Sequence, residues 1–198
     1  ALPISQISIE LGADKLLATA KSLGFNKQLY AKEVPLTKSR FNPSTDSKTE
    51  LGWAGIGQST TYINPTHFLA IINAIANVGT GYAPDRINNM GVLGEYVGRM
   101  PSVLVKMDAA TASQLKKMMR SNVTDKYGDA NFPGLQMCGK TGTAEIDGKK
   151  STSVFAGFSG NENLPLSVVC IAEEAGWGSG VAMKASNTVL QYFLKNYR

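Results

Sequence analysis

The chain has 198 residues and a net charge of +5. With 43% hydrophobic residues, it is long enough to form one sizeable core. It contains no apolar run long enough to span a bilayer, and its scattered lysines, without interleaved aromatic residues, exclude a nucleic-acid-binding stripe. Its two cysteines and single histidine, His67, indicate neither a disulfide framework nor a metal site, so we expect no cofactor.

The first 60 residues are predicted to hold one helix and a long irregular segment. Apolar side chains at helical spacing predict a helix over residues 5–23, ended by Gly24. Residues 32–51 are polar and contain two prolines, which is typical of irregular structure. The glycines around Trp53 predict a flexible loop, in which this side chain could line a groove.

The middle of the chain is predicted to be mostly helical. Asn64 followed by Pro65 is typical of a helix N-terminus, and the apolar residues after it predict a largely buried helix. His67 lies at that helix start, where we expect a packing or surface histidine and not a catalytic base. Residues 80–107 have mixed composition and predict short strands.

The second half predicts three antiparallel strands between two helices, an α+β arrangement in which the last helix docks on the sheet. Asp108 is expected to cap the first of these helices, with Leu115, Met118 and Met119 facing inward. Asp147 and Gly148 form a hairpin-turn signal. The predicted elements are a helix over 108–119, strands over 135–146, 151–159 and 164–174, a loop over 176–180 and a helix over 181–196.

The stretch with the most chemistry is Lys140-Thr141-Gly142-Thr143, and it fits two incompatible patterns. Residues 134–141 satisfy the phosphate-loop pattern G-x-x-x-x-G-K-[ST], in which backbone N–H groups and a lysine cradle phosphates. The same lysine, threonine and glycine satisfy the third motif of the penicillin-recognising serine enzymes, whose other motifs are S-x-x-K and S-x-N.

The surroundings disfavour the phosphate loop. That loop follows a buried strand and opens a helix, whose N-terminus supplies the N–H groups. Here Pro133 fits poorly in a central strand, and the residues after Thr141 predict a strand and a turn. A nucleotide-binding protein therefore stays the least favoured alternative.

Several sequence blocks, in this order, resemble the transpeptidase domain of class B penicillin-binding proteins, over nearly the whole chain. The strongest are the Ile56-Gly57-Gln58 block followed by the Asn64-Pro65-Thr66 helix start. The blocks are Leu11-Gly12-Ala13, Gly24-Phe25, Ile56-Gly57-Gln58, Asn64-Pro65-Thr66, Ala74-Ile75-Ala76-Asn77-Val78-Gly79 and Lys140-Thr141-Gly142-Thr143-Ala144-Glu145.

The resemblance implies an α+β fold, a mainly antiparallel sheet covered by helices, of the penicillin-binding and β-lactamase-like type. It also implies acyl transfer between peptidoglycan stem peptides through an acyl-serine that β-lactams trap. Lys140 and the N–H of Thr143 would be catalytic, and Lys140, Thr141, Gly142 and Thr143 would bind substrate. On the sheet order of that family, Cys138 and Cys170 fall on strands that flank a middle one, too far apart for a disulfide.

The other two motifs of the family are missing from the expected order. The only S-x-x-K is Ser113 to Lys116, expected on a solvated helix face, and the only S-x-N is Ser159 to Asn161, with turn composition. We therefore interpret residues 1–198 as the C-terminal portion of a transpeptidase domain, inactive alone. The N-terminal part and a membrane anchor would be absent, which predicts exposed apolar surface that could support self-association.

The expected location is the extracytoplasmic face of a bacterial membrane. The expected partners are stem peptides, β-lactams and cell-wall synthesis proteins. The alternative within the same fold is a non-catalytic β-lactam sensor or scaffold domain.

Overall fold

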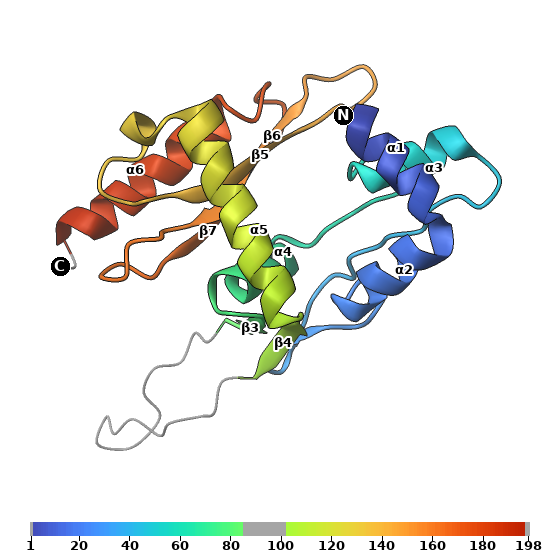
Figure 1. Ribbon diagram of the computed structural model, residues 1–198, viewed down its shortest axis with the longest axis horizontal. Helices are drawn as coiled ribbons and strands as arrows, with labels where there is room; N and C mark the ends of the chain where they lie inside the picture. The colour runs from blue at the N-terminus through green and yellow to red at the C-terminus, as the bar shows by residue number, and fades with distance from the viewer. Residues whose placement is uncertain (1, 85–101, 197–198) are drawn as a thin grey trace. The chain divides into compact units, whose positions relative to one another are not determined.

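The computed structural model describes residues 2–84 and 102–196 (Figure 1), and every strand pair within them is antiparallel. Its contacts divide the chain into two compact units, residues 1–70 with 80–106 and residues 71–79 with 107–198. In chain order the elements are α1 (Leu2–Leu11), α2 (Ala13–Ser22), β1 (Tyr30–Ala31), β2 (Val34–Pro35), α3 (Lys48–Gly55), α4 (Pro65–Ala76), β3 (Thr80–Tyr82), β4 (Val103–Lys106), α5 (Ala109–Asn122), η1 (Val123–Tyr127), η2 (Asp129–Asn131), β5 (Cys138–Ala144), β6 (Thr152–Phe158), β7 (Ser167–Ala172) and α6 (Val181–Asn196).

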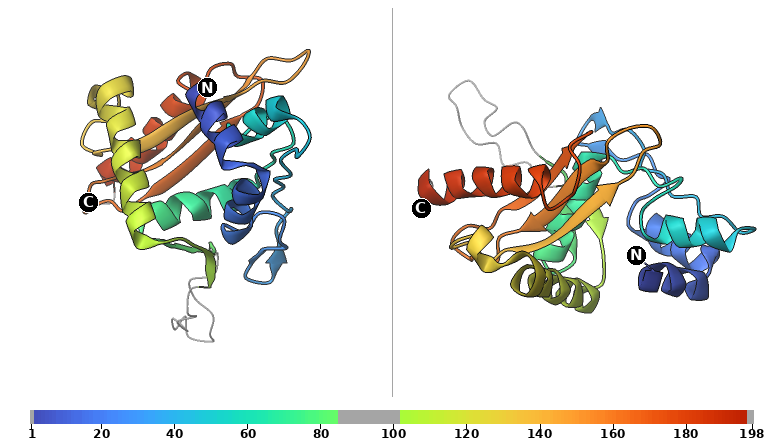
Figure 2. Two further views of the ribbon diagram at one scale, coloured as in Figure 1. Left: turned by 45° about the vertical axis from the view of Figure 1, so that its right-hand side comes forward. Right: turned by 90° about the horizontal axis from the view of Figure 1, so that it is seen from above.

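The second unit is built on a three-stranded sheet with the order β5-β6-β7. Helix α6 packs on β6 and β7, and α5 packs on β5 (Figures 1 and 2). Phe155 lies in the core under α6, whereas Phe158, three residues on, faces the other way, beneath Lys116 of α5. The two helices therefore cover opposite faces of the sheet.

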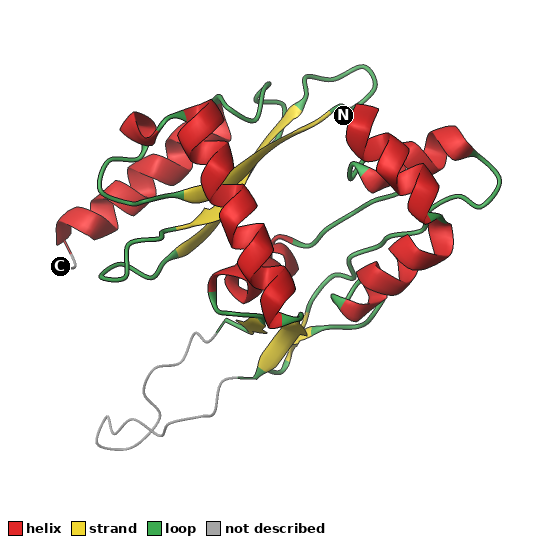
Figure 3. Cartoon of the chain, viewed as in Figure 1, coloured by secondary structure: helices red, strands yellow, loops and turns green. Residues whose placement is uncertain are grey.

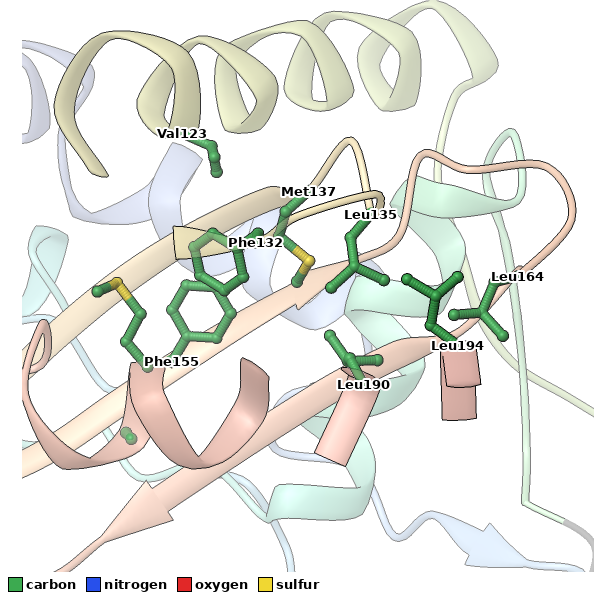
Figure 4. Close-up of a cluster of buried hydrophobic side chains, with 10 residues drawn as sticks. Val123, Phe132, Leu135, Met137, Phe155, Leu164, Leu190 and Leu194 are labelled. Carbon is green, nitrogen blue, oxygen red and sulfur yellow. The ribbon is translucent and has the colours of Figure 1, made fainter. Parts of the chain in front are cut away.

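The core of this unit lies between the sheet and α6 (Figure 4). Phe132 stacks on Phe155 with ring centroids 5.5 Å apart, which anchors the segment before β5 to the middle strand. The buried members are Val123, Phe132, Leu135, Met137, Phe155, Leu164, Ala182, Met183, Leu190 and Leu194.

The sequence-based assignment of this unit is largely confirmed. The three strands form where predicted, each shorter at both ends, and α6 has the predicted bounds. Gly148 has a φ of 72° in the predicted turn, and the Lys149 N–H donates to the Ile146 carbonyl at 3.1 Å. Cys138 and Cys170 lie on the outer strands, both as free thiols.

Helix α5 is capped as predicted but runs further. The Asp108 carboxylate accepts from the Thr111 N–H at 2.9 Å. The helix ends at Asn122 instead of Met119 and continues into the π-helical turn η1. Met118 was wrongly expected to face inward: it is 63% exposed, whereas Met119 is buried. A helix repeats every 3.6 residues, so two adjacent methionines rarely share one face.

The first unit contains the main errors in the predicted elements (Figure 3). The single predicted helix is two, α1 and α2, because Gly12 between them has a φ of 82° that breaks the helical path. The segment expected to be irregular, residues 32–51, holds β2, which pairs with β1 just before it, and the start of α3. Trp53 lies in α3 and not in a loop.

The glycines of α3 serve packing and not flexibility. A β-carbon at Gly52 would lie 3.3 Å from the Ser5 β-carbon, and one at Gly55 would overlap the Ser8 side chain. These two residues therefore let α1 and α3 approach closely. The outer side of α1 carries exposed apolar side chains, as predicted, among them Leu2, Ile4 and Ile7. Self-association through them stays a prediction.

His67 is a buried packing residue, as expected. Its Nε2 lies 2.8 Å from the Leu23 carbonyl oxygen, which only accepts, so Nε2 carries the proton. Its Nδ1 lies 2.7 Å from Ser39 Oγ, and Ser39 in turn accepts from the Asn64 N–H at 3.0 Å. Burial lowers the pKa of His67, and the hydrogen bond to Leu23 acts against that shift.

Across residues 2–84 and 102–196, no helix combines the length and apolarity needed to cross a bilayer. Within the same ranges, no three His, Cys, Asp or Glu side chains gather closely enough to hold a metal ion.

Candidate functional site

The whole Lys140–Thr143 motif lies on β5, which is an outer strand of the sheet. It pairs with β6, Lys140 opposite Ala156 and Thr143 opposite Ser153, and no other strand in the described part of the chain pairs with its outer edge. The residues predicted to act together are therefore consecutive on one edge. No helix begins at Lys140, which removes the helix N-terminus that a phosphate loop needs and contradicts the nucleotide-binding alternative.

The backbone of this strand presents alternate residues to the outer edge. The Thr141 N–H donates to the Tyr127 hydroxyl at 3.1 Å, so it points away from β6. Along an antiparallel strand, every second residue directs its N–H and C=O to the same side. The N–H of Thr143 therefore also faces the outer edge.

The side chains of the motif divide between the two faces of the sheet. Thr141 lies opposite Phe155, on the side of α6, so Lys140 and Gly142 lie on the other side. Lys140 is exposed, and its Nζ donates to the Thr141 carbonyl at 2.6 Å. This contact holds the ammonium group against the strand edge.

Among residues 2–84 and 102–196, packing does not require a glycine at position 142. A β-carbon there would lie 3.4 Å from the Val154 β-carbon, an ordinary contact. By contrast, a β-carbon at Gly139 would lie 2.5 Å from the Phe155 ring. Core packing therefore requires a glycine at position 139. Gly142 instead leaves room above the strand, on the face that also carries Lys140.

A loop after β7 is fastened to the motif from the α6 side. The Gly178 N–H donates to Thr143 Oγ1 at 3.0 Å, and a β-carbon at Gly178 would overlap the Gly142 carbonyl oxygen. Ser153 Oγ donates to the Trp177 carbonyl at 2.8 Å and accepts from the Ala182 N–H at 3.2 Å. The buried Ser153 therefore ties the loop, the start of α6 and the sheet together.

A basic groove of about 710 Å³ lies between α5 and the start of β5. Ser113, exposed on α5 as expected, and Lys116 both line it, so the accidental S-x-x-K faces solvent beside Cys138. Burial raises the pKa of the Cys138 thiol, although the charge of Lys116 acts in the opposite direction. Ser159, the other accidental motif serine, is buried and donates to the Leu135 carbonyl at 3.1 Å.

Three residues that support the motif carried no signal that singled them out. Tyr127 reaches Thr141 only because a π-helical turn extends α5, and no local pattern predicts such a turn. Ser153 is one of several hydroxyl residues before an apolar run, and Gly178 one of several glycines in a loop. Their contacts span 14, 24 and 35 residues, beyond the reach of local patterns.

Comparison with known proteins gives a family and a fold. The model of the penicillin binding protein transpeptidase domain matches residues 2–191. The peptidoglycan D,D-transpeptidase PbpA of Mycobacterium tuberculosis is 29% identical over 149 residues, which cover 71% of this chain and 29% of that protein. The match thus spans less than a third of that relative's length.

Solved structures agree. The D,D-transpeptidase domain of a peptidoglycan glycosyltransferase from Eggerthella lenta superposes with a TM-score of 0.83 at 26% identity, covering 100% of this chain and 52% of that one. Penicillin-binding protein A of M. tuberculosis, as an imipenem acyl-enzyme complex, gives 0.83 at 22% identity and covers 96% and 44%. At that identity the second likeness concerns the fold alone.

Proposed function

The chain belongs to the penicillin-binding protein transpeptidase domain family, and we propose that the full-length protein containing it crosslinks peptidoglycan stem peptides. The observation that supports this most directly is the Lys140–Thr143 motif, which occupies an open sheet edge with its alternate backbone groups directed outward. β-Lactams would compete for the same edge, since the relatives include an imipenem acyl-enzyme.

The proposed reaction has two steps. A serine oxygen attacks the carbonyl carbon of a donor stem peptide, and the bond to its terminal residue breaks, so that this residue leaves as an amine carrying the serine proton. The amine of a second stem peptide then attacks the acyl-serine, which restores the serine hydroxyl. With a β-lactam, the ring C–N bond opens and the amine remains attached, so the acyl-serine persists.

Each step passes through an oxyanion. We assign residues of β5 to stabilise this oxyanion and to bind the substrate. The N–H of Thr143 is the proposed oxyanion donor, a contribution of about 3 to 4 kcal/mol when such a group is preorganised. Lys140 supplies a positive charge that favours a ligand carboxylate and assists proton transfer. Thr141 and Thr143 offer hydroxyls, and Gly142 leaves space for the ligand.

The nucleophilic serine is assigned to a part of the full-length protein outside residues 1–198, which would make this chain the C-terminal portion of the domain. Two facts support this: the solved relatives are about twice as long as the stretch matched, and Ser113 is an exposed helix residue. A membrane anchor, the extracytoplasmic face of the envelope and cell-wall synthesis proteins as partners belong to the same proposal.

The test is intact-mass measurement after incubation with benzylpenicillin, on the full-length protein and on residues 1–198. We expect one covalent adduct on the full-length protein, mapped to a serine outside this chain, and none on the short chain. Ser113→Ala in the full-length protein is the matched control and should leave the adduct unchanged. An adduct on Ser113 would overturn the placement of the nucleophile.

Release of the terminal residue from a stem peptide separates the enzyme from its alternative. An adduct without such release would favour a β-lactam sensor or scaffold domain, and no adduct on the full-length protein would remove β-lactam recognition altogether.

A further inference from the structure

Tyr127 lies against the proposed site but belongs to none of its motifs. It is the last residue of η1, the π-helical turn that extends α5. Its hydroxyl accepts the Thr141 N–H at 3.1 Å and lies 3.0 Å from Thr141 Oγ1. Single π-helical turns are frequent at functional sites, and this one brings a phenol to the outer edge of β5.

The phenol is held in place from several sides. Its ring packs against the buried cluster between the sheet and α6. The Gly128 N–H donates to the Val123 carbonyl at 2.7 Å, and the Asn131 amide donates to the Tyr127 carbonyl. These contacts fix the backbone on both sides of the ring, so the hydroxyl position is determined by the fold.

The segment that follows is tied back to α5 by one arginine. Arg120 pairs with Asp129 in a bidentate contact and also donates to the Met137 carbonyl at 3.0 Å. The hydrogen bond from Arg120 lowers the pKa of Asp129, which favours its charged form. The ion pair therefore links α5, the turn after Tyr127 and the start of β5.

Counting protons shows what Tyr127 and Thr141 present to a ligand. Together the two hydroxyls carry two protons, and one of them lies in the bond between the oxygens. If Tyr127 donates to Thr141, the Thr141 proton points elsewhere; if Thr141 donates, the Tyr127 proton does. In either arrangement the pair keeps one O–H donor for a third group.

We propose that Tyr127 is a positioning residue for substrate recognition, one that holds Thr141 so that the pair directs this O–H at the ligand carboxylate. The inference rests on the proposed function, in which the outer edge of β5 binds the ligand and Thr141 offers its hydroxyl there. A charged acceptor makes the hydrogen bond stronger than a neutral one.

The test compares two ligands that differ at the carboxyl group, one charged and one neutral, in the full-length protein. Tyr127→Phe keeps the packed ring and removes the hydroxyl. We expect acylation by benzylpenicillin to slow about tenfold, and acylation by its methyl ester, which lacks the anionic carboxylate, to change less than about twofold. Tyr30→Phe, which removes an exposed phenol hydroxyl from β1, is the matched control and should change neither rate.

A double-mutant cycle adds a second readout. Thr141→Val combined with Tyr127→Phe should slow benzylpenicillin no more than about twofold beyond the slower single variant, because the two hydroxyls act as one donor. Additive losses of acylation rate in the double variant would overturn the proposal. So would an equal loss of rate for benzylpenicillin and its methyl ester in Tyr127→Phe, because that result would indicate a structural role. If the unmodified protein forms no adduct, the proposed function fails and this inference fails with it; an adduct with unchanged Tyr127→Phe rates rejects this inference alone.

Discussion

The polar residues around His67 and those along β5 are used in opposite ways. His67 is fully buried, and both ring nitrogens are bonded within the chain, to Ser39 and to Leu23. On β5, Lys140 is exposed, and the backbone of alternate residues faces the outer edge of the sheet. A polar group whose bonds are completed inside the fold stabilises it, whereas one held at an open edge can bind a ligand.

The largest effect should follow from removing the charge on β5. Lys140→Met in the full-length protein is expected to slow acylation by benzylpenicillin about 100-fold, equivalent to about 2.7 kcal/mol of transition-state stabilisation. Its free energy of unfolding should change by less than about 0.5 kcal/mol, because the side chain is exposed. Stopped-flow acylation and denaturant unfolding measure the two quantities. A large loss of stability with normal acylation would reverse the assignment of this strand.

Two glycines that meet at the motif allow a sharper separation. Gly178→Ala should destabilise the protein by about 1 to 3 kcal/mol, because the new methyl group would overlap the Gly142 carbonyl. Gly142→Ala should change stability by less than about 0.5 kcal/mol, since its methyl group meets Val154 at an ordinary distance. It should nevertheless slow acylation about tenfold by filling the space left for the ligand.

Unfolding midpoints and acylation rates of the two variants, measured side by side, provide the check. If Gly142→Ala proved as destabilising as Gly178→Ala and equally reactive with benzylpenicillin, Gly142 would be a packing residue like Gly139.

The smallest effect concerns pH and should be confined to the His67 region. The pKa of His67 in the folded protein lies below its ordinary value of 6.5 because the ring is buried. The unfolded chain therefore binds the proton more readily, so stability is complete above pH 6.5 and is lost as the pH falls towards the folded pKa. The slope is at most about 1.4 kcal/mol per pH unit.

His67→Gln provides the comparison, because its amide does not titrate. Unfolding curves between pH 5 and 8 should show a weaker pH dependence for the variant than for the unmodified protein. Equal slopes would mean that His67 binds protons equally in the folded and unfolded states.

The sequence by itself determined the elements that depend on local chemistry. The residues around the Asp147-Gly148 turn predicted the three strands of the sheet, and Asp108 was identified as a helix cap. The Lys140–Thr143 motif and the blocks before it indicated the family that the match over residues 2–191 confirms. These signals act over a few residues, so they can be recognised without the fold.

The start of α3, which was predicted to be irregular, does have a local sequence signal. Ser47 and Glu50 are spaced as in a capping box, and Ser47 Oγ accepts the Glu50 N–H at 3.3 Å at the start of α3. The two glycines later in that helix obscured the signal, because glycine is usually unfavourable within a helix. Here they are required by the close approach of α1.

Only the tertiary structure decided which residues surround the motif. Tyr127, Ser153 and Gly178 are distant in sequence from their partners, and their roles depend on a π-helical turn, a buried strand position and a returning loop. The tertiary structure also distinguishes Gly142 from Gly139, two glycines three residues apart on the same strand. Their difference comes from the nearest side chain of β6: Val154, opposite Gly142, lies at an ordinary distance, whereas the ring of Phe155, diagonal to Gly139, lies in close contact.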